Sequence, residues 1–205
     1  MSTGQMIEIL GRLRKQMNGE ISELMMMHGV NYALNYGVAI HSIKEIARDY
    51  APNTKLARLL YSQQVRDLQI AACYIADPAD ILIADQEFWG EAVINGEMAE
   101  QLSGLIARCE NCDRFVESWL GNPNSNLQYC ALLAAAKSHS PIAAVRVADY
   151  ALALTKSDSV RTRVIATILS KNYNLPPIAQ AIIQIKQSDV LAHKQINDEI
   201  YIYDN

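Results

Sequence analysis

Residues 53–78 read NTKLARLLYSQQVRDLQIAACYIADP, two apolar helical stripes framed by turn signals. In the second stripe the apolar side chains recur every three or four residues, at Val65, Leu68, Ala72 and Ile75. That spacing places them on one face of an α-helix. Pro52-Asn53-Thr54 is typical of a helix start with an Asn or Thr cap, and Asp77-Pro78 ends one helix and opens the next. The segment therefore predicts a pair of short helices.

The same apolar spacing continues outward along the chain. Stripes with a period near 3.6 recur over residues 40–50, 98–106, 142–152, 160–168 and 178–185. Paired, these helices form units of roughly 35–40 residues, the period of HEAT-type repeats. Because such a pair cannot bury its apolar face alone, the pairs are expected to stack into a curved solenoid with a concave surface. We predict an all-α superhelix forming a single HEAT-like domain over residues 1–205.

Composition limits the class of protein. The 205 residues are 50% hydrophobic and 20% charged, which is incompatible with overall disorder. No apolar run approaches the roughly 20 residues that cross a bilayer. Neither a signal peptide nor a membrane partner is expected, and the predicted location is cytoplasmic.

Cys109 and Cys112 form a lone C-x-x-C pair. A zinc site needs four ligands, and neither a second pair nor a His pair follows at a suitable distance. A redox role needs a thioredoxin-like context, which is absent from the sequence. The four histidines are scattered. We therefore expect free thiols, no metal and no cofactor, and treat a redox or metal protein as the least favoured alternative.

An ordered series of short motifs runs through residues 36–78. It reads Tyr36-Gly37-Val38, then IKEIA over 43–47, LARLLY over 56–61, VRD over 65–67 and ADP over 76–78. The series resembles the DNA alkylation repair family of HEAT-like proteins, the AlkD-like alkylpurine DNA glycosylases, and the order and spacing continue along most of the chain. The resemblance supports the solenoid and implies a site for DNA in its concave groove.

The resemblance also implies a chemistry. Cleavage of the glycosidic bond of a cationic N-alkylated purine develops positive charge on the deoxyribose. A carboxylate beside that sugar stabilises the charge electrostatically. Aromatic rings offer cation–π contacts to the alkylated base or the sugar. The family presents these groups in its groove without a deep base-flipping pocket.

The core motif of the family corresponds here to Asn95-Gly96-Glu97-Met98-Ala99-Glu100. By this resemblance Glu97 and Glu100 stand in place of two aspartates, and Glu100 is the candidate for the charge-stabilising role. The two acids lie three residues apart on one helix, so we expect each to raise the pKa of the other.

Other positions of the family pattern are replaced. Gly96, Asn126 and Thr167 stand where the family has tryptophan, and Tyr129 and Ser170 stand where it has arginine, while Arg163 keeps its cation. Trp89 lies beside Phe88 near a helix start, and we predict that it belongs to the core rather than replacing a missing ring.

Charge is unevenly distributed along the chain. Residues 81–130 carry a net charge of −6 and residues 131–194 a net charge of +5, within an overall charge of −4. We expect six cations to line the concave face of the C-terminal half and to contact DNA, namely Lys137, Arg146, Lys156, Arg161, Arg163 and Lys171. The acidic segment opposes such contact, so binding to double-stranded DNA is predicted to be weak and salt-dependent.

These observations favour a DNA alkylation repair family protein that serves as a HEAT-like DNA-binding scaffold with a degenerate glycosylase site. One alternative is an active alkylpurine DNA glycosylase that uses Glu100. The other is a helical-repeat scaffold that binds another protein, because a fold alone does not determine function.

Overall fold

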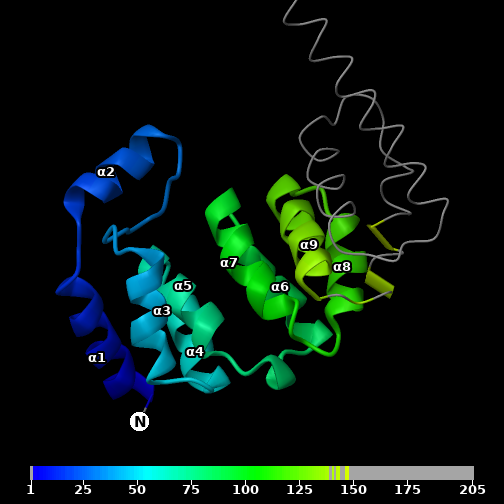
Figure 1. Ribbon diagram of the computed structural model, residues 1–205, viewed down its shortest axis with the longest axis horizontal. Helices are drawn as coiled ribbons and strands as arrows, with labels where there is room; N and C mark the ends of the chain where they lie inside the picture. The colour runs from blue at the N-terminus through cyan, green and yellow to red at the C-terminus, as the bar shows by residue number, and fades with distance from the viewer. Residues whose placement is uncertain (1, 139, 141, 144–145, 148–205) are drawn as a thin grey trace, which may run out of the picture.

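The computed structural model describes residues 2–138, 140, 142–143 and 146–147, and every regular element within them is helical (Figure 1). The α-helices are α1 (Ser2–Arg14), α2 (Gly19–Met27), α3 (Ile40–Arg48), α4 (Thr54–Tyr61), α5 (Arg66–Ile75), α6 (Gln86–Glu91), α7 (Gly96–Ile106), α8 (Cys112–Leu120) and α9 (Ser125–Ser138). Two short 3-10 helices, η1 (Pro78–Asp80) and η2 (Ile83–Asp85), precede α6. The predicted all-α class is confirmed for this part of the chain.

The helices are arranged in two layers (Figure 1). Helices α3, α5, α7 and α9 pack side by side in chain order and form one row. Helix α4 packs on α5 and α8 packs on α9 as a second layer, while α1 covers α3 and α4. We call the solvent-facing side of the row the row face; it carries Lys44, Tyr74, Glu100, Gln101, Tyr129 and Lys137, with Arg108 just past the end of α7.

Side-chain caps fix where several helices begin. The Asn53 side chain accepts a hydrogen bond from the Leu56 amide, at 3.0 Å, and so caps α4 as the sequence predicted. Asn95 caps α7 in the same way through the Met98 amide, at 3.0 Å. An Asn at this position satisfies one of the amides that lack a helical partner. The caps set the register in which α7 presents its acidic side chains.

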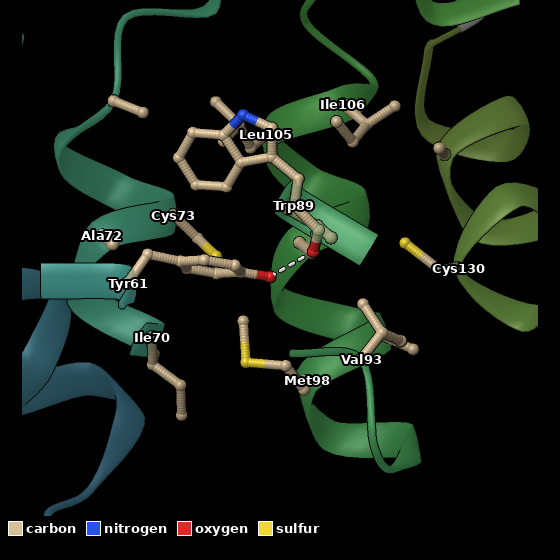
Figure 2. Close-up of a cluster of buried hydrophobic side chains, with 14 of the residues drawn as sticks. Tyr61, Ile70, Ala72, Cys73, Trp89, Val93, Met98, Leu105, Ile106 and Cys130 are labelled. Carbon is tan, nitrogen blue, oxygen red and sulfur yellow. Dashed lines mark hydrogen bonds between the residues drawn. The ribbon is translucent and has the colours of Figure 1, made fainter. Parts of the chain in front are cut away.

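Trp89 lies in the centre of the core (Figure 2). Its side chain is fully buried, which confirms the prediction that it is a core residue. The Tyr61 hydroxyl donates to the Trp89 carbonyl at 2.5 Å, and the two rings lie 4.7 Å apart between centroids. Because Tyr61 ends α4 and Trp89 belongs to α6, this pair joins α4 to α6.

No helix within the described residues is long and apolar enough to cross a membrane.

Gly37 sits where the start of α2 meets the segment that leads into α3. Its φ of +68° lies in the left-handed region. A Cβ at this position would overlap the carbonyl oxygen of Asn18, whose amide donates to the Tyr36 carbonyl at 2.8 Å. Only glycine satisfies both the backbone angle and the close approach.

Gly37→Ala is therefore expected to destabilise the protein more than Gly29→Ala. Gly29 is the matched control, because its φ is also positive at +77° but no atom lies within 4 Å of its Cβ position. The Gly29 variant should lose about 1 kcal/mol of unfolding free energy from backbone strain alone. The Gly37 variant should lose about 2 kcal/mol more because of the overlap. Urea denaturation of both variants measures the difference, and equal losses would show that the contact with Asn18 is unimportant.

Candidate functional site

Glu97 belongs to a buried ion pair between α5 and α7. Its carboxylate accepts two hydrogen bonds from the Arg66 guanidinium, from Nη2 at 2.6 Å and from Nε at 2.8 Å. The Tyr32 hydroxyl donates to the same carboxylate at 2.8 Å. A carboxylate held by a bidentate arginine and a tyrosine is fixed in place. Glu97 is thus directed at α5 and the segment before α3.

Arg66 is itself surrounded by further acceptors. Its side chain is 4% exposed, and Nη1 donates to the Val38 carbonyl at 2.9 Å and to the Asp67 carboxylate at 3.0 Å. The fully buried Asp67 also accepts the amides of Tyr36 and Val38, at 2.8 and 3.1 Å. One buried network thus ties α5, α7 and residues 36–38 together.

The expectation that Glu97 and Glu100 raise each other's pKa is wrong for Glu97. Burial opposes ionisation of this carboxylate, but the hydrogen bonds and charge of Arg66, with the Tyr32 hydroxyl, outweigh burial and lower its pKa. Asp67 likewise takes part in the Arg66 network, so the guanidinium faces two carboxylates. The error arises because an arginine 31 residues away in sequence acts on Glu97 more strongly than its neighbour on the helix.

Glu100 lies one turn further along α7 and faces α9 instead. It is exposed, and its Oε1 accepts a hydrogen bond from the Tyr129 hydroxyl at 3.2 Å. No ion pair to another described residue holds it. The structure therefore directs the two candidate acids to different neighbours: Glu97 contacts Arg66 and Tyr32 between α5 and α7, and Glu100 is a single carboxylate on the row face.

Lys137 is the predicted DNA contact that the structure places beside Glu100. Its Nζ donates to the Glu100 carbonyl at 3.0 Å and to the Ser103 hydroxyl at 2.7 Å. Partial desolvation lowers the pKa of this ammonium, and the charge of Lys44 acts in the same direction. Lys137 thus lies on the row face, across α7 from Tyr74.

The other predicted DNA contacts are not all on this face. Arg146 pairs with Glu117 of α8 at 3.2 Å, so it is directed at the second layer. The remaining four lie outside the described residues, as do Thr167 and Ser170; these contacts are Lys156, Arg161, Arg163 and Lys171.

Two cations that the sequence analysis missed complete the row face. The Lys44 Nζ lies 5.1 Å from the centre of the Tyr74 ring, and the Tyr74 hydroxyl donates to Gln101 Oε1 at 2.5 Å. Arg108 Nε donates to the Gly104 carbonyl at 3.0 Å. Burial raises the pKa of Tyr74 to about 12, and the charge of Arg108 opposes that rise. The charged positions on the solvent-facing side of each predicted helix would have indicated Lys44 and Arg108, whereas the net charge of a whole segment did not.

Three described positions differ from the pattern of the resembled family: Gly96 and Asn126 replace tryptophans, and Tyr129 replaces an arginine. Gly96 begins α7, and nothing lies within 4 Å of where its Cβ would be. Asn126 is half-buried at the start of α9. Tyr129 supplies an aromatic ring next to Glu100, with its hydroxyl on that carboxylate. The described part of the site thus has one tyrosine, Tyr129, on its exposed acid and open space at Gly96.

The cysteines are buried free thiols, as predicted for Cys109 and Cys112. Burial raises the pKa of the Cys109 thiol to about 12 and also raises that of Cys112. Such thiols are poor nucleophiles and poor metal ligands in this state. Across the residues that the structure describes, no three His, Cys, Asp or Glu side chains are placed to hold a metal ion.

The arrangement of helices is similar to that of a solved structure. That structure represents "a new family of proteins related to the HEAT-like repeat DNA glycosylases with affinity for branched DNA structures". The two superpose with a TM-score of 0.73 over 89% of this chain and 82% of the other. The fold is a HEAT-like repeat fold. The predicted curved stack of helix pairs is thereby confirmed.

The sequences themselves have diverged. The two chains are 14% identical, so the likeness establishes the fold and leaves the function to be argued from side chains. No family model matches the chain. No curated protein matches it either.

The Glu97 ion pair predicts a pH dependence of stability. A folded pKa below the ordinary value of 4.5 means that the pair stabilises the fold above that value and that this contribution is lost as the pH falls through the folded pKa. Glu97→Gln should cost about 2 kcal/mol of unfolding free energy at neutral pH, because it breaks a charged hydrogen bond.

Denaturation from about pH 3 to about pH 7 tests this, and the difference between the two proteins should shrink towards the acid end. Glu100→Gln removes an exposed carboxylate from the same helix and is the control, with an expected change within about 0.5 kcal/mol. A difference that stays constant with pH would contradict the ion-pair account.

Proposed function

We propose that this chain is a DNA-binding HEAT-like scaffold that lacks efficient glycosylase activity and takes branched DNA as its target. The observation that carries the proposal is the set of cations on the row face, Lys44, Arg108 and Lys137, which have no carboxylate partner among the described residues. Such cations are suited to neutralising phosphates. The affinity for branched DNA stated for the similar structure supports the choice of substrate.

The state of the two acids supports the loss of excision. Glu97 accepts hydrogen bonds from Arg66 and Tyr32, so reaching a deoxyribose would require breaking a buried ion pair. Glu100 is exposed, but it carries one more methylene than the aspartate of the resembled family and bonds to Tyr129. A misplacement of about 1 Å can lower a rate about a hundredfold.

Glu100 also supports the second candidate function, an active alkylpurine glycosylase. Its carboxylate lies on the same face as Lys137, so DNA bound there would bring a sugar within its neighbourhood. Tyr74 and Tyr129 would then supply rings for a cationic base. This function requires Glu100 to approach the sugar directly.

A protein-binding scaffold is supported by α2. This helix has no buried residue, and its exposed apolar side chains are Ile21, Leu24, Met26 and Met27. Methionine-rich surfaces adapt to varied partners. Absence of DNA binding at low salt would favour this function over the other two.

The two DNA-based functions predict opposite effects of Glu100→Gln. In a scaffold, the Glu100 carboxylate repels the phosphates that Lys137 attracts, so removing its charge should tighten binding by about twofold to fivefold. In an enzyme, the same change should abolish release of 7-methylguanine. Fluorescence anisotropy with a labelled four-way junction measures the first, and base release from methylated DNA measures the second.

Glu8→Gln is the matched control for net charge, because Glu8 is exposed on α1 and outside the row. It should leave the dissociation constant within about twofold of the unmodified protein. Robust base release by the unmodified protein, abolished in Glu100→Gln, would overturn the proposal in favour of the active enzyme.

A further inference from the structure

The cations of this protein fall into two groups. Several are paired with a carboxylate, as in Arg12–Asp49 at 2.7 Å, Arg58–Asp85 at 2.8 Å and Arg146–Glu117 at 3.2 Å. Lys44, Arg108 and Lys137 have no such partner among the described residues, although they come from three different parts of the row. We call these three side chains the row-face triad.

A chain of hydrogen bonds and ring contacts brings the triad together. Lys44 lies over the Tyr74 ring at 5.1 Å, and Tyr74 donates to Gln101, the neighbour of Glu100. Lys137 donates to the Glu100 carbonyl at 3.0 Å, so Lys44 and Lys137 approach α7 from opposite sides. Arg108 follows on the same helix face, on the Gly104 carbonyl.

The electrostatics agree with this closeness. Burial lowers the pKa of Lys137, the charge of Glu100 opposes that shift, and the charge of Lys44 adds to it, while the charge of Arg108 acts on Tyr74. Among the described residues, the three cations outnumber the single Glu100 carboxylate on the row face, so the face carries a local excess of positive charge even though the whole chain carries a net charge of −4. Such a surface favours a ligand that carries several negative charges close together.

DNA provides that density best where it branches. A linear duplex carries one charge per about 1.7 Å of axis, and its two backbones run apart around the helix. At a branch point the backbones of different arms converge, so phosphates of two strands come within reach of one small patch. Three cations that reach the surface of α7 from α3, from α9 and from the end of α7 itself match that arrangement better than they match one strand.

We propose that Lys44, Arg108 and Lys137 act as one clamp on the backbones of two converging strands, and that this clamp sets the preference for branched over linear DNA. The inference rests on the proposed function, since it assumes that the row face binds DNA. Glu100 is not needed for the preference. The clamp reads phosphate position rather than base sequence.

The test compares a four-way junction with a linear duplex built from arms of the same sequence. The triple variant Lys44→Gln, Arg108→Gln, Lys137→Gln and the unmodified protein are titrated by fluorescence anisotropy from about 50 mM to about 200 mM salt. For each phosphate that a variant no longer neutralises, the slope of log affinity against log salt becomes shallower by about 0.9. In the triple variant the slope should become shallower by about 2 to 3 on the junction and by about 1 on the duplex.

A control variant separates the clamp from net charge. Lys15→Gln, Lys55→Gln and Arg114→Gln together remove the same charge from exposed cations outside the row, which also lack a carboxylate partner within the described chain. This control should retain the junction preference of the unmodified protein. Thermal denaturation checks that both triple variants remain folded, which is expected because every substituted side chain is exposed.

The outcomes separate the two proposals. Two results would overturn the clamp and leave the scaffold function intact, provided that the unmodified protein binds the junction. In the first, the triad variant loses affinity for the junction and for the duplex to the same extent. In the second, the triad variant and the control variant lose the same affinity for the junction. Failure of the unmodified protein to bind either DNA at low salt overturns the scaffold function itself. Selective loss of junction binding in the triad variant alone supports the clamp.

Discussion

The buried guanidinium of Arg66 is the interaction on which the arrangement of the row depends. It reaches the Glu97 carboxylate of α7, the Asp67 carboxylate of α5 and the Val38 carbonyl. A charge 4% exposed is costly unless every hydrogen-bond donor finds a partner, because a buried charge without its partner destabilises the fold. The network therefore couples the position of α7 to α5 and to the chain that enters α3.

This constraint divides the acidic side chains of α7 between two tasks. Glu97 is used by the framework, because its oxygens face Arg66 and Tyr32. Glu100, one turn later, remains on the surface beside Tyr129 and Lys137. Because α7 is fixed at its N-terminal end, it holds Glu100 on the row face, with Arg108 just past its other end. The geometry of the row face therefore depends on Arg66, a buried residue that is not part of that face.

Local patterns in the sequence were sufficient for α3, α4, α5 and α7 and for the fold class. Apolar spacing located the stripes of α3, α5 and α7, Asn53 marked the start of α4, and the burial of Trp89 followed from its neighbours. The short motifs resembled a HEAT-like family, and the fold superposes on a HEAT-like structure although the two chains are 14% identical.

The site was harder to predict, because it depends on contacts between distant residues. The role of Glu97 is set by Arg66, 31 residues earlier, and helix-neighbour reasoning gave the wrong direction for its pKa. Lys44 and Arg108 were not predicted as part of the site, because the net charge of a segment averages over all faces of a helix.

A crystal structure of the protein bound to a four-way junction tests the clamp most directly. We expect phosphates of two strands on Lys44, Arg108 and Lys137 while Glu97 stays on Arg66. A purine nucleotide seated against Glu100, or DNA bound on the layer of α4 and α8, would contradict this expectation.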